Sequence, residues 1–169
     1  MPVRHVSSQM ALPPFQQLLD AHGADVHRFL VAIVGRVDAD DCYQETWIAA
    51  LGAYPRLRTS ANLRAWILTV AHRKALDHLR AGRRRAKPVG DALERAASVA
   101  SPQAAEDGVP EVWASVRELP VKQRTAIALR FLAGASHAEI GAVMRTSEEA
   151  ARRNVHEGLK RLRAEYRDG

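Results

Sequence analysis

The chain has 169 residues, enough for one domain or two small ones, and its richness in Ala, Leu, Arg and Glu favours an all-α protein. A formal net charge of +6 favours a polyanionic partner, and a single cysteine, Cys42, excludes an internal disulfide and fits a reducing cytoplasm. Since no apolar run reaches membrane-spanning length and no signal-peptide core is found, we expect a cytoplasmic protein without membrane insertion.

The N-terminal part predicts a tail followed by one long helix. Residues 1–12 are expected to be a disordered tail, because no apolar periodicity occurs there. From Phe15 onward apolar residues recur at helical spacing, and Gly23 marks either a break or a close packing contact. Gly35 is the expected stop of this helix.

Residues 38–80 predict two amphipathic helices joined by a short loop that contains Pro55. Asp38 is the candidate N-cap of the first, and either Asn62 or Ser60 that of the second. The second helix carries one stripe of apolar residues, which we expect to be buried: Leu63, Trp66, Ile67, Val70 and Ala71. With the preceding helix, these two are expected to form a three-helix domain that covers residues 13–82.

A basic run and a change of composition follow this first domain. Arg83-Arg84-Arg85-Ala86-Lys87 is either a solvated helix end or an extension of a phosphate-contacting surface. The chain then turns to Ala, Ser, Asp and Glu as far as Gly108, with Pro and Gly at both ends. We therefore expect a flexible linker over residues 83–109.

Residues 110–169 predict a second small helical domain. Pro110 and Pro120 suit first helical positions, and the helices that they open should end near Leu119 and at Gly134.

The end of this domain has the pattern of a helix-turn-helix. Ser136 and Glu139 form a capping box for a short helix that ends at Met144, and Ser147 caps a longer one. A plain helical bundle with a charged outer face is the alternative. The second helix is rich in basic residues, as a DNA-recognition helix is: Arg152, Arg153, His156, Lys160, Arg161 and Arg163.

Two stretches of the chain resemble the extracytoplasmic-function (ECF) group of bacterial sigma factors. DADDCYQETWIAAL and NLRAWILTVAHRKALDHLR are similar to the family's region 2, and ELPVKQRTAIALRFLAGASHAEIGAVM is similar to region 4. Both occur in the family's order and spacing, with a linker between them. The resemblance implies an alternative RNA polymerase sigma factor, which is not an enzyme and holds no cofactor or metal ion.

The resemblance also implies roles for individual residues. Region 2 would dock on the coiled coil of the largest polymerase subunit through Asp41, Gln44, Glu45 and Trp47, and region 4 would contact the polymerase flap. The minus-ten promoter element would be melted and contacted by Thr59, Ser60, Asn62, Arg64, Arg73, Lys74, His78 and Arg80. The minus-thirty-five element would be contacted by Arg152, Arg153, His156 and Lys160. An anti-sigma factor would be a further partner.

Two departures from the family pattern concern region 4. Arg145 stands at the bend of the helix-turn-helix, where the family usually carries glycine, and a left-handed backbone there would cost free energy. Glu148 and Glu149 open the recognition helix, where carboxylates are expected to repel DNA phosphates.

Three other functions remain alternatives. A polymerase-independent helix-turn-helix regulator would have no use for the acidic docking helix. An enzyme acting on nucleic acid would need metal-binding carboxylates, a Ser/His/Asp set or a phosphate-binding glycine loop, and the sequence predicts none of these. A helical adaptor that binds only protein would be favoured if region 4 did not bind DNA.

Overall fold

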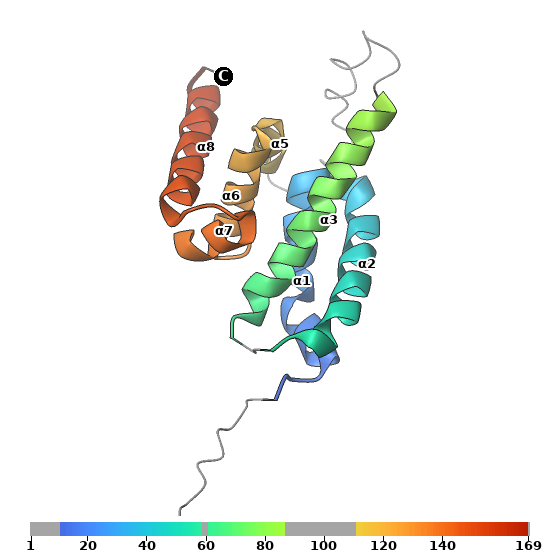
Figure 1. Ribbon diagram of the computed structural model, residues 1–169. Helices are drawn as coiled ribbons and strands as arrows, with labels where there is room; N and C mark the ends of the chain where they lie inside the picture. Colours follow the sequence, from blue (N-terminus) through green and yellow to red (C-terminus); the bar gives the residue numbers. More distant parts are fainter. Residues whose placement is uncertain (1–10, 59–60, 87–110, 169) are drawn as a thin grey trace, which may run out of the picture.

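A computed structural model describes residues 11–58, 61–86 and 111–168, and these residues form helices without any strand (Figure 1). The helices are α1 (Phe15–Val34), α2 (Arg36–Ala53), the 3-10 turn η1 (Tyr54–Arg56), α3 (Leu63–Ala86), α5 (Glu111–Glu118), α6 (Val121–Phe131), α7 (His137–Met144) and α8 (Glu148–Asp168). The predicted all-α fold is confirmed for this part of the chain. Most of the predicted tail and linker lies outside the described residues.

Helices α1, α2 and α3 with η1 form the first lobe. Helix α1 is unbroken at Gly23, where an added Cβ would lie 2.8 Å from the Tyr43 hydroxyl, so this glycine marks a close contact. Gly35 ends α1 with a φ of 84°, and α2 begins at the next residue. The prediction that Asp38 caps α2 is wrong, because this turn lets the helix start three residues earlier, at Arg36, and places Asp38 in its first turn.

Helix α3 begins at a capped turn and extends further than the sequence suggested. The Asn62 side-chain oxygen accepts a hydrogen bond of 3.1 Å from the Ala65 backbone N–H, so Asn62 is a cap residue. Ile67 and Ala71 are fully buried, and Trp66 is half-buried against the Tyr54 ring. The helix continues to Ala86, so the three arginines before it are helical and exposed.

Helices α5 to α8 form the second lobe, with α7 and α8 as a helix-turn-helix. Ser136 accepts a hydrogen bond from Glu139 N at 3.1 Å, and Ser147 accepts one from Ala150 N at 3.0 Å, so both predicted caps are confirmed. Arg145 has the left-handed conformation, with φ 55° and ψ 48°. Pro120 is the residue before α6 rather than its first residue, and α6 ends at Phe131, before Gly134.

The two lobes pack side by side and share one core (Figure 1). Buried side chains of α6 and α7, among them Leu129 and Ile140, belong to the same apolar cluster as Ile33 of α1. The Arg124 guanidinium joins the lobes, since it donates to the Ile33 carbonyl at 2.8 Å and to the Leu119 carbonyl at 3.2 Å. The first bond satisfies a carbonyl in the last turn of α1, which has no partner within its own helix.

Candidate binding surfaces

One face of α2 combines acidic and exposed apolar side chains. Asp41, Gln44 and Glu45 are exposed, as the docking assignment requires. Ile48 is 71% exposed and Leu51 56% exposed. Because Asp41, Gln44, Ile48 and Leu51 follow one another at intervals of three or four residues, they lie along one side of the helix. The α2 surface is defined as Asp41, Gln44, Glu45, Ile48 and Leu51.

Trp47 is not part of the α2 surface. Its side chain is only 6% exposed and packs edge-on against Phe15 and Tyr43, with ring centroids 5.7 and 6.1 Å away. The ring belongs to the core beneath the surface, and the predicted role of Trp47 in docking stays a prediction. Ile48 and Leu51, which the sequence-based assignment omitted, supply the exposed apolar area instead. Their spacing of four and seven residues from Gln44, typical of one helix face, was the available signal.

Cys42 lies just beneath the same acidic face. It is fully buried, and this burial, assisted by the negative charges of Glu45, Asp38 and Asp41, raises the pKa of the thiol to about 11. The thiol stays protonated at neutral pH and is a packing residue.

The residues predicted to contact the minus-ten element do not share one face. Arg73 and Arg80 are exposed and lie seven residues apart on one side of α3. Arg80 also lies 3.9 Å from the Asp77 carboxylate, a solvent-exposed contact of little energetic weight. Thr59 and Ser60 lie outside the described residues.

Other members of this set are engaged inside the protein. His78 Nε2 lies 3.3 Å from the Asp38 carboxylate of α2, and Lys74 is half-buried. Arg64 points toward the second lobe, where its guanidinium lies against Gly134 and its Nε is buried without a hydrogen-bond partner. Asn62 uses its side-chain oxygen to cap α3. Arg73 and Arg80 are thus the members most available for a DNA phosphate.

Helix α8, the second helix of the helix-turn-helix, presents its basic residues on one exposed side. Its buried residues Ala151, Val155 and Leu162 lie on the opposite side of the helix. The exposed side carries all four residues predicted to contact the minus-thirty-five element, Arg152, Arg153, His156 and Lys160.

The two acids at the start of α8 are paired within the helix. Glu148 lies 3.2 Å from Arg152, and Glu149 lies 4.0 Å from Arg153. The predicted repulsion of phosphate is thus partly neutralised, and the same pairs compete with phosphate for the two arginines. The α8 surface is defined as Arg152, Arg153, His156 and Lys160.

Neither a metal site nor a membrane span is found in the part of the chain that the structure describes. No three potential ligands among His, Cys, Asp and Glu come together there. None of the described helices is long and apolar enough to cross a membrane.

Comparison with known proteins identifies both lobes. Residues 18–85 match Sigma-70 region 2, and residues 111–162 match Sigma-70, region 4. The ECF RNA polymerase sigma factor SigD of Mycobacterium tuberculosis is 34% identical over 160 residues, which cover 89% of this chain and 76% of SigD. SigX of Bacillus subtilis is 29% identical over 158 residues, covering 88% and 81% of the two chains.

A solved structure gives the same fold. The sigma factor RpoE of Bartonella quintana, in complex with the anti-sigma factor NepR, superposes with a TM-score of 0.72 at 18% sequence identity. The superposition covers 89% of this chain and 94% of that one. The matched regions define a sigma-70 type transcription factor. More narrowly, the chain belongs to the ECF group of RNA polymerase sigma factors, as its two motif stretches indicated.

Proposed function

We propose that this alternative sigma factor directs promoter-specific transcription initiation by binding core RNA polymerase with its first lobe and promoter DNA with both lobes. The α2 surface carries the proposal. It places exposed carboxylates beside Ile48 and Leu51, which are 71% and 56% exposed. Exposed apolar side chains next to charged ones are characteristic of a protein-docking site rather than of a DNA-binding face.

The two basic surfaces supply the DNA contacts of the proposal. Arg73 and Arg80 on α3 would contact the phosphates of the minus-ten element, and Asn62 stands at the end of the loop that precedes α3. The α8 surface would enter the major groove at the minus-thirty-five element, as the second helix of a helix-turn-helix does. The proposed partners of the second lobe also include the polymerase flap.

An anti-sigma factor is a further proposed partner. The support is the RpoE structure, in which a sigma factor of the same fold is bound to an anti-sigma factor. A cytoplasmic location fits a subunit of RNA polymerase.

Run-off transcription tests this function. Purified core polymerase is incubated with genomic promoter fragments, with and without the full chain. New transcripts that start at discrete sites and require the chain are the expected result. If the chain binds DNA fragments but neither binds core polymerase nor yields transcripts, it is a polymerase-independent helix-turn-helix regulator instead.

A further inference from the structure

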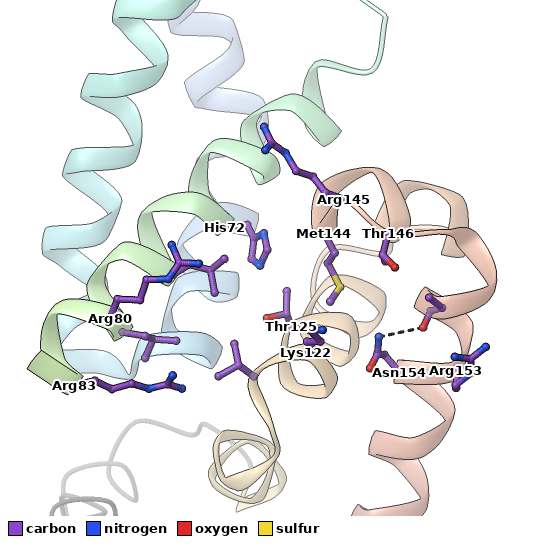
Figure 2. A pocket seen from close by; sticks show the side chains of 14 residues that line it. His72, Arg80, Arg83, Lys122, Thr125, Met144, Arg145, Thr146, Arg153 and Asn154 are labelled. Carbon is purple, nitrogen blue, oxygen red and sulfur yellow. Dashed lines mark hydrogen bonds between the residues drawn. The ribbon is translucent and has the colours of Figure 1, made fainter.

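The seam between the two lobes holds a cleft whose basic lining only partly overlaps the proposed promoter contacts, at Arg80 and Arg153. It has a volume of about 600 Å³ and lies between α3 on one side and helices α6, α7 and α8 on the other. Figure 2 shows His72, Arg80 and Arg83 projecting from α3 toward Lys122 and Thr125 of α6. Its volume is in the range of small-molecule sites.

The charge in this cleft is of one sign. Five cationic side chains line it, two from the first lobe and three from the second, and none of its fourteen lining residues is an Asp or a Glu: the cations are Arg80, Arg83, Lys122, Arg145 and Arg153. No ion pair of Arg83, Lys122 or Arg145 with another described residue is found. Like charges that face each other across a seam repel. A multivalent anion bound between them would relieve this repulsion and stabilise the packed lobes.

The floor of the cleft is not polar throughout. Leu76, Leu79, Val121 and Met144 provide an apolar area, against which a flat ring can pack. Beside them, Thr125 is fully buried and its hydroxyl has no hydrogen-bond partner. This hydroxyl lies too deep to be reached from the cleft, so a ligand would contact the basic side chains and the apolar area only. A ligand that fits carries several negative charges and one apolar ring system.

We propose that the interlobe cleft binds an anion with at least three linked phosphate groups, and specifically a nucleoside polyphosphate. Arginine forks match phosphate oxygens in two-pronged hydrogen bonds, and arginine planes also stack on rings. The base would lie on the apolar floor near Met144. Inorganic polyphosphate offers the same charges without the ring.

Binding would stabilise the packed arrangement of the lobes, because the cations that form the site come from both. A ligand that binds only this arrangement shifts the equilibrium toward it. Arg80 and Arg153 would then be shared between the ligand and promoter DNA. This consequence rests on the proposed function, whereas binding itself does not.

Isothermal titration calorimetry of the full chain with ATP, GTP, inorganic tripolyphosphate and adenosine tests the site. The expected result is one nucleotide per chain, tripolyphosphate bound about tenfold more weakly, and no binding of adenosine. Equal affinity for tripolyphosphate and ATP would overturn the nucleoside assignment. Absence of nucleotide binding, together with binding of a short DNA duplex that requires Arg83 and Lys122, would assign the cleft to DNA.

Two charge-matched variants separate the cleft from general attraction to a basic chain. Arg83→Gln with Lys122→Gln should weaken ATP binding about tenfold or more, while Arg163→Gln with Arg167→Gln, on the exposed end of α8, should leave it unchanged. Equal losses in both variants would mean non-specific binding and overturn the proposal.

Failure of this inference differs from failure of the proposed function. If the chain supports run-off transcription but does not bind nucleotide in calorimetry, only the cleft assignment is wrong. If it binds nucleotide in the cleft but does not bind core polymerase, the sigma function is wrong and the site remains.

Discussion

The α2 and α8 surfaces present charges of opposite sign, and they differ in how those charges are satisfied. On α8, Arg152 and Arg153 are paired with glutamates one turn away in the same helix. On α2, the exposed carboxylates are accompanied by Ile48 and Leu51, whose apolar side chains only a partner could cover. On the proposed function, this difference means that the first lobe buries a surface against protein. The second lobe would make exchangeable electrostatic contacts, which salt weakens.

The largest effect is expected from reversing charge on the α2 surface. Asp41→Lys with Glu45→Lys should lower the affinity for core polymerase about a hundredfold. The two carboxylates would attract the polymerase surface, and the two ammonium groups that replace them would be repelled by it. Fluorescence titration of the labelled chain with core polymerase measures this. Asp20→Lys with Asp25→Lys, the same charge change on α1, is the control. An affinity equal to that of the control would remove the α2 surface from the docking site.

A somewhat smaller effect is expected from the apolar part of that surface. Ile48→Ser with Leu51→Ser should weaken polymerase binding about tenfold or more, since each exposed side chain would bury apolar area at a value of about 25 cal/mol per Å². The same titration measures it. Val37→Ser, on α2 but 82% exposed and outside the α2 surface, is the comparison variant. Wild-type affinity of the double variant would mean that docking is electrostatic only.

On the α8 surface the expected change is in salt dependence. Arg152→Ala with Arg153→Ala should weaken promoter binding and reduce the slope of log K against log salt by about two, one unit for each lost phosphate contact. DNA binding at several salt concentrations measures the slope. Polymerase binding of this variant should be that of the wild type. An unchanged slope would show that the intrahelical pairs with Glu148 and Glu149 keep these arginines from DNA.

The smallest effect concerns the turn that positions α8. Arg145 holds a left-handed backbone with φ 55°, so Arg145→Gly should stabilise the fold by about 0.5–1 kcal/mol and raise the melting temperature by about 1–4 °C. Gly134→Ala, at φ 63°, should lower it by a similar amount. Thermal unfolding followed by circular dichroism measures both. A shift of the same sign in the two variants would contradict the strain assigned to Arg145.

Much of the fold could be predicted from sequence, because caps and helical periodicity are local. Ser136 and Ser147 accept the hydrogen bonds that their positions predicted, and Asn62 rather than Ser60 is the described cap of α3. The cap of α2 was wrongly predicted at Asp38, because the local sequence pattern does not specify the positive φ of Gly35, which depends on the packing of the helices. The length of α3 was missed because an arginine run suits a helix and a linker equally.

The candidate site was harder to predict, since burial is a property of the packed chain. Trp47 and Ile48 are neighbours in sequence, yet the first is 6% exposed and the second 71%. A helix turns by about 100° per residue, so adjacent side chains point to different surroundings that only the neighbouring helices decide. The contacts of Arg64 with Gly134 and of Arg124 with Ile33 cross the two lobes, and no local pattern predicts them.

Site-specific photo-crosslinking tests the division of labour between the lobes most directly. A photoreactive amino acid is placed at Gln44 or at His156, and each chain is irradiated in complex with core polymerase and promoter DNA. Position 44 is expected to crosslink to the largest polymerase subunit and position 156 to DNA. Crosslinking of position 44 to DNA, or of position 156 to the largest subunit alone, would contradict it.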